Sequence, residues 1–286
     1  VDDARADRFS DASLRAMTYE GSLWGLPLAV KSLALFYNTD LVATPPATTD
    51  ELIALKRDDR YALAYANIDL YGHAPWLHGF GGRVLDDDGN LAIATPEAAA
   101  AMDFVADLAQ RKIVPKDAQN SDVASMFNAG VAATVMLGPW AIPDISADLH
   151  WKVAPLPIIS ATGKPAAPYL GAEGIVMSAR AHDKDAAFAV MDALTSDAAA
   201  IVRAREARQV VANVHAYDDP EVARDPVLRA FRTQLQHTVA MPNNPTMRMV
   251  WTPYRTALGE VIAGRSDAPT QLRKVQDEVQ GYVDRR

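Results

Sequence analysis

The chain has 286 residues, 49% of them hydrophobic and 22% charged, so it is long enough for one large or two medium domains with a packed core. Its formal net charge of −8 disfavours nucleic acid or an anionic membrane surface as a partner, because both require clustered Lys and Arg. Without cysteine, neither disulfides nor thiolate metal sites are available, and the compartment is not decided by redox chemistry. No apolar run approaches the roughly 20 residues of a membrane span, and the charged opening, residues 1–9, is unlike the core of a signal peptide.

Strands and helices alternate along the chain, which predicts an α/β fold. After helix and loop over residues 1–20, strands are expected over 23–27, 32–38, 61–66, 131–137, 151–157 and 169–177. Helices are expected over 50–57, 73–80, 95–109, 183–194, 197–207, 251–263 and 271–283, with two short ones starting at Pro220 and Pro226. Residues 67–73 are expected to be a loop at a sheet edge, and residues 241–245 a non-helical link.

Residues 126–140 combine a helix end, a buried strand and an aromatic side chain. Gly130 is typical of a helix C-terminus, because glycine adopts the left-handed conformation without strain. The apolar run 131–137 is typical of a buried strand, which Gly138 and the following proline end. Trp140 therefore follows a strand end, where open α/β sheets place ligands. Its flat apolar face suits the C–H face of a sugar, although this stretch alone favours a core position.

Motifs for metals and catalysis are weak. The acidic run Asp86–Asp88 lacks the Gly and Glu spacing of a calcium loop and predicts a tight turn instead. His73 and His78 are five residues apart, which does not suit two ligands on one helix face, so surface or capping roles are expected. Neither a Gly-x-Ser-x-Gly motif nor a glycine-rich dinucleotide or phosphate loop occurs. The sequence therefore predicts no metal and no cofactor.

Several short motifs occur in a characteristic order. They are Gly21-x-Leu23-x-x-Leu26-Pro27-x-Ala29-Val30, Leu35-Phe36-Tyr37-Asn38-x-Asp40-Leu41, Thr95-Pro96-Glu97-Ala98, Phe127-x-x-Gly130 followed by Gly138-Pro139-Trp140, Met241-Pro242-Asn243, and Trp251 with Arg255-Thr256-Ala257. Their order resembles the extracellular solute-binding proteins of ABC sugar importers, most closely the maltodextrin-binding members. The resemblance covers nearly the whole chain from about Gly21 onward, and it implies a periplasmic-binding-protein-like fold with two lobes.

The resemblance also implies a division into lobes. Residues 1–41 and 169–240 are expected to form part of the N-terminal lobe with the crossings between lobes, and residues 42–168 and 241–286 the C-terminal lobe. Members of the family carry several βα units of about 30 residues before the segment that matches Gly21. Only twenty residues precede it here, so the N-terminal lobe is expected to be incomplete.

An incomplete lobe would leave apolar surface uncovered. The apolar remnant near Trp24, Leu35, Ile175 and Val176 is expected to pair with a second copy of the chain, a partner chain or residues 1–20. The chain by itself is then expected to bind sugar weakly or not at all.

Carried over by matching position, the sugar-site candidates are Lys31, Asp69, Tyr71, Trp140, Met241, Trp251 and Arg255. Carbohydrate sites combine stacked aromatic rings with polar groups aimed at hydroxyls, and these candidates come from separate stretches that the fold would bring to one cleft. This convergence favours ligand stacking for Trp140. For Met241 and Arg255, simple packing or a structural salt bridge is an equal alternative.

Two positions depart from the resemblance. Lys31 stands where the maltodextrin-binding members carry a carboxylate, and an ammonium can only donate hydrogen bonds. Thr252 replaces an aromatic neighbour of the late tryptophan. Maltose is therefore in doubt as the ligand, and a modified or acidic sugar is an alternative.

The resemblance favours a non-enzymatic receptor for a maltodextrin-like oligosaccharide. Such a receptor works with the transmembrane subunits of an ABC permease, in the periplasm or outside the cell, and is associated with the membrane through the transporter. Two alternatives stay open. One is a carbohydrate-active enzyme that uses Asp69, with Glu173 as the other carboxylate near a strand end. The other is a truncated interaction domain without a functional cleft.

Overall fold

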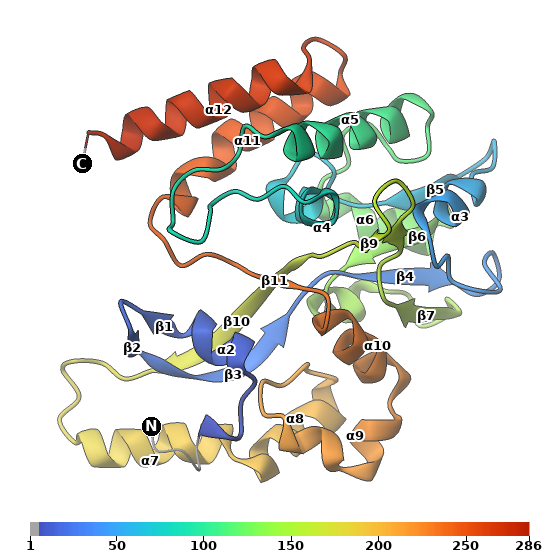
Figure 1. Cartoon of the computed structure of the whole chain (residues 1–286). Helices are drawn as coiled ribbons and strands as arrows, with labels where there is room; N and C mark the ends of the chain where they lie inside the picture. The colour runs from blue at the N-terminus through green and yellow to red at the C-terminus, as the bar shows by residue number, and fades with distance from the viewer. Residues whose placement is uncertain (1–5, 286) are drawn as a thin grey trace. The chain divides into compact units, whose positions relative to one another are not determined.

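The computed structural model describes residues 6–285, with the elements labelled in Figure 1. The chain divides into two compact units: unit 1 comprises Val1–Ser32 and Leu170–Asn243, and unit 2 comprises Leu33–Tyr169 and Asn244–Arg286. What the sequence predicts for residues 1–5 lies outside the described residues. The assignment of segments to lobes made from the sequence stays a prediction.

Unit 1 is built around a small sheet with the strand order β11-β10-β3. Its elements are α2 (Asp11–Ala16), β1 (Thr18–Tyr19), β2 (Ser22–Leu23), β3 (Gly25–Lys31), β10 (Tyr169–Val176, beginning at the last residue of that segment of unit 2), α7 (Lys184–Thr195), α8 (Asp197–Ala207), η2 (His215–Asp218), α9 (Pro220–Arg224), α10 (Pro226–Leu235) and β11 (Val239–Ala240). Strands β3 and β10 are antiparallel, with an irregularity in register between Glu173 and Gly174. Pro27 has no N–H to donate, which fits the position of β3 at the edge of this sheet.

Unit 2 contains a sheet with the strand order β5-β6-β4-β7, in which β5 and β6 are parallel and the other pairs antiparallel. Its elements are β4 (Ala34–Asn38), α3 (Thr49–Ala54), β5 (Tyr61–Ala64), α4 (Leu70–Phe80), α5 (Pro96–Gln110), α6 (Asn120–Asn128), β6 (Ala132–Leu137), η1 (Pro139–Asp144), β7 (Trp151–Ala154), β8 (Ile158–Ile159), β9 (Lys164–Pro165), α11 (Met247–Ile262) and α12 (Ala268–Val283). Every residue of β4 and β6 is buried, which explains why their sequences are largely apolar.

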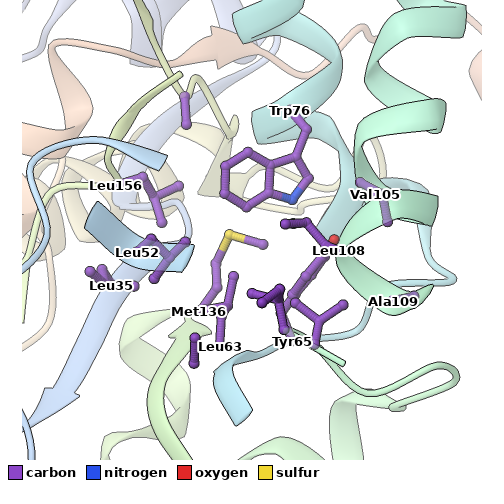
Figure 2. Close-up of a cluster of buried hydrophobic side chains, with 14 of the residues drawn as sticks. Leu35, Leu52, Leu63, Tyr65, Trp76, Val105, Leu108, Ala109, Met136 and Leu156 are labelled. Atoms are coloured by element: carbon purple, nitrogen blue, oxygen red, sulfur yellow. The ribbon is translucent and has the colours of Figure 1, made fainter. Parts of the chain in front are cut away.

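The main core of unit 2 lies between the sheet and the helices α4 and α5. Figure 2 shows Trp76 of α4 and Met136 of β6 pointing toward one another among surrounding leucines. Helix α5 packs closely because its inner face is formed largely by alanine, with Val105 and Leu108 fully buried. Burying each large apolar side chain contributes about 1.5–3 kcal/mol relative to leaving it exposed. Within residues 6–285, no helix has the length and apolar character needed to cross a membrane.

Local signals in the sequence are confirmed at several element ends. The hydroxyl of Thr48 accepts a hydrogen bond from the backbone N–H of Glu51 at 3.2 Å and caps α3, close to the helix start expected near residue 50. Thr95 caps α5 in the same way. Gly130 follows the end of α6 with a φ of +68°, and β6 begins directly afterwards. The acidic run forms the expected tight turn, in which the Asp86 carboxylate accepts two backbone N–H groups.

Other expectations were wrong. Helix α4 begins at Leu70 and α11 at Met247, so both extend further toward their N-termini than the sequence indicated. His73 is completely buried inside α4 and has neither a surface nor a capping role. Leu35 is also completely buried, in the core of unit 2, so it is not part of an exposed apolar remnant. Trp24 and Val176 of unit 1 are exposed, as expected, at 65% and 66%.

Candidate functional site

The candidate site is a pocket of about 410 Å³ within unit 2. Its walls come from the end of β5 and the start of α4, the start of α6, the end of β6 with the turn after it, and one side chain of α11. The lining residues are Leu33, Ala66, Ile68, Asp69, Tyr71, Gly72, Ala118, Gln119, Asn120, Ser121, Met136, Trp140 and Arg255. Four of the residues that the resemblance implied, Asp69, Tyr71, Trp140 and Arg255, are therefore brought together in one pocket.

Asp69 has two roles at the start of α4. One carboxylate oxygen accepts a hydrogen bond from the backbone N–H of Tyr71 at 2.8 Å, so Asp69 is the N-cap rather than part of a loop. The other accepts a hydrogen bond from the guanidinium of Arg255 at 3.1 Å. The Arg255 side chain is 61% exposed and that of Asp69 31%. Both groups are therefore only partly enclosed, so that lone pairs of Asp69 and N–H groups of Arg255 stay available to a ligand in the pocket.

The aromatic wall of the pocket is formed by Tyr71 and Trp140. Their ring centroids are 6.1 Å apart with a tilt of 54° between the planes. Trp140 is 42% exposed, so part of the indole face is available to a ligand. The indole lies against the backbone of Gly138, where any Cβ would overlap the ring. Glycine at this strand end is thus required by the position of the tryptophan, in addition to ending the strand.

Tyr71 lies deeper than Trp140. Burial raises the pKa of its phenol, so the group is neutral at physiological pH. Its hydroxyl is buried and has no hydrogen-bond partner among the described residues. The contribution of Tyr71 to the pocket is therefore mainly an apolar ring edge and face beside Trp140.

The polar wall was not identified from the sequence. Gln119, Asn120 and Ser121 line the pocket at the start of α6. They supply amide and hydroxyl groups that both donate and accept hydrogen bonds. The backbone N–H of Gln119 donates to the Asp122 carboxylate at 3.1 Å, but a Gln-x-x-Asp start lacks the usual Ser/Thr-x-x-Glu capping signal. The usual capping residues therefore did not mark the start of α6 in the sequence.

The other three predicted residues are placed differently. Lys31 and Met241 belong to unit 1. The ammonium of Lys31 donates to a carboxylate oxygen of Glu173 at 2.7 Å, while its alkyl chain lies over Gly171. The backbone N–H of Met241 donates to the carbonyl of Leu170 at 3.0 Å, which extends the pairing of β11 with β10.

Trp251 belongs to unit 2 but is not among the residues that line this pocket. It lies one helical turn before Arg255 on α11, so the two side chains emerge from the same face of the helix. It is half-buried. Trp251 is therefore adjacent to the lining of the pocket rather than part of it.

The chemistry available in the pocket is recognition by stacking and hydrogen bonding. The two carboxylates considered for catalysis each have a cationic partner of their own, Arg255 for Asp69 and Lys31 for Glu173. Within residues 6–285, no group of three or more His, Cys, Asp or Glu side chains is placed to hold a metal ion. The lining instead offers aromatic faces, one ion pair and neutral amide and hydroxyl groups.

Comparison with known proteins gives matches over most of the chain. Residues 2–230 match the family described as bacterial extracellular solute-binding protein. A maltotriose-binding protein of Pyrococcus abyssi is 29% identical over 98% of this chain and 64% of the relative. A maltodextrin-binding protein of Bacillus subtilis is 27% identical over 92% of this chain and 67% of the relative. The chain thus spans about two thirds of the length of these curated relatives.

A solved structure gives a similar result. The crystal structure of a cyclo/maltodextrin-binding protein complexed with maltotetraose is 32% identical and superimposes with a TM-score of 0.89. The match covers 97% of this chain and 76% of that one. The periplasmic-binding-protein-like α/β fold expected from the sequence is thereby confirmed. With the family match over residues 2–230, these likenesses identify the chain as a member of the bacterial extracellular solute-binding proteins, a family of binding proteins rather than enzymes.

Proposed function

We propose that the chain binds a malto-oligosaccharide in the unit 2 pocket. The observation that carries this proposal is that an exposed aromatic face and a partly exposed ion pair line the same pocket: Trp140, packed on Tyr71, and Asp69 with Arg255. A glucose unit has an apolar C–H face and a rim of hydroxyls. Stacking on an aromatic ring buries the C–H face, and hydrogen bonds to the polar side chains satisfy the hydroxyls.

The polar groups suit a neutral sugar. Asp69 and Arg255 offer an acceptor and a donor 3.1 Å apart, which matches neighbouring hydroxyls that each donate and accept. Gln119, Asn120 and Ser121 add neutral partners. The ammonium of Lys31 would favour an acidic sugar if its charge were unpaired, but the carboxylate of Glu173 lies 2.7 Å away and balances it. A neutral oligosaccharide is therefore the better fit to the charges present.

Lys31, Met241 and Trp251 are included in the proposed site as further ligand contacts. Trp251 is supported by its place one turn from Arg255 on α11. Lys31 and Met241 are supported by the resemblance at their positions.

The biological role proposed is that of the substrate-binding component of an ABC importer. Membership in the extracellular solute-binding family supports a location outside the cytoplasm. We place the protein in the periplasm or at the outer face of the membrane, where it delivers its ligand to the transmembrane subunits of the importer. The names of the relatives, which bind maltotriose or maltodextrin, support a malto-oligosaccharide as cargo.

Titration of the chain with maltotriose by calorimetry tests the proposal. Trp140→Ala should weaken binding by about 2 kcal/mol or more, because it removes the exposed stacking face. Trp24→Ala is the matched control, since Trp24 is an exposed tryptophan of unit 1 that does not line the pocket. Equal affinity of native protein and the Trp140 variant would remove Trp140 from the site.

The enzymatic alternative is tested on the same samples. Maltotriose recovered after prolonged incubation should be unaltered, because no acid and nucleophile pair is positioned across the pocket. Release of shorter sugars that disappears in Asp69→Asn would instead identify a carbohydrate-active enzyme.

The proposal also includes self-association through unit 1. Trp24 and Val176 line an open groove of about 300 Å³ with Tyr19, and all three side chains are exposed. Exposed apolar side chains gathered in this way are typical of surfaces that contact another protein. The partner proposed here is a second copy of the chain.

A further inference from the structure

Four aromatic rings of unit 2 lie in consecutive contact, from the pocket into the interior. We call Trp140, Tyr71, Tyr169 and His78 the ring series. The centroid distances along it are 6.1 Å, 6.4 Å and 4.8 Å, and the last contact is edge-to-face at 77°. Centroid separations of 4.5–7 Å with tilted planes are the geometry in which aromatic pairs attract one another.

The helix α4 explains how two members of the series are aligned. Tyr71 and His78 are seven residues apart on α4, so they project from the same face two turns apart. The ring of Tyr169, at the start of β10, contacts both of them. Tyr169 therefore connects the two positions of α4 through ring contacts alone.

The middle of the series has no hydrogen bond to fix it. The hydroxyls of Tyr71 and Tyr169 are both buried without a hydrogen-bond partner in the part of the chain that the structure describes. The orientation of each phenol ring therefore depends on its neighbouring rings and the surrounding packing. If the ring at one end of the series changes orientation, no hydrogen bond of the two phenol groups in the middle restrains the rings that follow.

The two ends are fixed. At the inner end, Nδ1 of His78 lies 2.7 Å from the carbonyl oxygen of Ala167. A carbonyl only accepts, so Nδ1 carries the proton and the imidazole plane is held in one orientation. At the pocket end, the indole of Trp140 lies against the backbone of Gly138.

We propose that His78 is a positioning residue for the carbohydrate site, holding the face of Trp140 through Tyr169 and Tyr71. The ligand part of this inference rests on the proposed function, whereas the ring arrangement exists without ligand. His78 itself does not line the pocket. Its role is to keep the aromatic wall in the orientation that receives a sugar, so that little ordering is needed on binding.

The first test is spectroscopic and needs no ligand. The near-ultraviolet circular dichroism of native protein minus that of Trp140→Phe isolates the signal of the Trp140 ring in its surroundings. The same difference spectrum is then measured in a His78→Ala background, between the proteins with and without Trp140→Phe. Its amplitude should be less than about half of the native amplitude, because without His78 the Tyr169 ring no longer fixes the Tyr71 ring beside Trp140. An unchanged difference spectrum in a folded His78→Ala protein would overturn the proposal.

The second test measures binding of maltotriose. His78→Ala should weaken affinity about 3- to 10-fold, the range expected when one aromatic contact stops restraining the next. His78→Phe keeps a ring against Tyr169 and should recover at least half of that loss on a logarithmic scale. In a Trp140→Ala background the effect of His78→Ala should fall to less than about twofold, because its target has been removed.

A matched control separates positioning from loss of stability. Val279 of α12 is completely buried in unit 2 and lies outside the ring series, so Val279→Ala should destabilise the protein without changing the Trp140 signal or the affinity. If Val279→Ala changes both as much as His78→Ala does, the effect is one of general stability and the proposal is wrong. If native protein does not bind maltotriose, the proposed function fails, and the ligand-free spectra still decide the role of His78.

Discussion

Asp69 illustrates how one side chain can serve both the fold and the site. It caps α4 through the backbone N–H of Tyr71 and pairs directly with Arg255 in the lining of the pocket. The cap uses one carboxylate oxygen and the ion pair uses the other. These two functions can be separated by substitution, because asparagine keeps an oxygen that can cap a helix but loses the charge.

Asp69→Asn is therefore expected to leave the free energy of unfolding within about 0.5 kcal/mol of the native value, since an exposed ion pair contributes little. Asp69→Ala removes the cap as well and should cost about 1 kcal/mol. Both variants should bind maltotriose more weakly. Urea unfolding and calorimetry on the same preparations check this, and an Asn variant as unstable as the Ala variant would contradict the assignment of the cap.

Gly72 is constrained by the backbone beneath it. A Cβ at this position would overlap the carbonyl oxygen of Ala66, which belongs to the turn before α4 and cannot rotate away. Gly72→Ala should destabilise the chain by about 1–3 kcal/mol, because the start of the helix must shift.

Gly259→Ala is the matched control for Gly72. Gly259 lies inside α11, and a Cβ there would meet no atom within 4 Å. This substitution should stabilise the chain by about 0.5–1 kcal/mol through helix propensity. Thermal unfolding of the two variants should therefore give shifts of opposite sign, and a shared sign would show that steric contact at Gly72 is not decisive.

At the scale of elements, α4 contributes both to the pocket and to the response to acid. Burial lowers the pKa of His73 to about 3, and the nearby His78 adds to this effect. Burial also lowers the pKa of His78 to about 4, against the opposing hydrogen bond to Ala167. Both imidazoles are thus neutral in the folded chain at pH values where they are charged in the unfolded chain, whose histidines titrate near 6.5.

The sign of the pH dependence follows from proton binding. Below about pH 6.5 these two histidines bind protons in the unfolded chain but not in the folded chain. Their contribution to the free energy of unfolding is therefore present above that pH and is lost as the pH falls toward about 4. The urea midpoint should accordingly be lower at about pH 5 than at about pH 7.5. His73→Phe should reduce this difference, because phenylalanine binds no proton in either the folded or the unfolded chain. If the urea midpoint changes equally between these two pH values in the native protein and in His73→Phe, the prediction is wrong.

The elements that the sequence predicted well have local signals at their ends. Helix α3 begins where the hydroxyl of Thr48 precedes an acidic first turn, and α5 begins where Thr95 precedes a proline at the first helical position. Strand β6 was recognised because an apolar run stands between a glycine and a Gly-Pro pair. The start of α4 was missed because Asp69 stands three residues after the strand-ending apolar run, where a short polar stretch indicates a loop equally well.

The candidate site was predictable only in part. Asp69 and Arg255 are 186 positions apart, and no local pattern indicates that their side chains meet. Their selection came from the resemblance to a family, as did that of Tyr71. The polar wall at Gln119–Ser121 was missed because its residue types are common in loops and its cap lacks the usual residues. The burial of His73 was missed because packing of α4 against α11 decides it, through contact with Tyr254.

For the whole molecule, the exposed apolar groove of unit 1 predicts association. Trp24 and Val176 should support a concentration-dependent dimer in size-exclusion chromatography with light scattering. Replacing both by serine should shift the equilibrium toward monomer. Replacing Val190 of α7 and Val202 of α8 by serine is the control and should not, because these two exposed valines lie outside the groove. A native chain that stays monomeric at high concentration would contradict the proposed self-association.

Both units are discontinuous in sequence, and this has a consequence for the order of events during synthesis. The last segment of unit 1 ends at Asn243, and at that point in synthesis unit 2 still lacks the segment from residue 244 onward. Helices α11 and α12 cover α5, and Arg255 of α11 closes the pocket beside Asp69. On the ribosome, the strands of the unit 2 sheet are therefore made early. The face of α5 that α11 and α12 cover stays exposed until these last two helices emerge. During that interval the nascent chain exposes apolar surface of α5 that the finished molecule buries, which favours aggregation until the last two helices have been made.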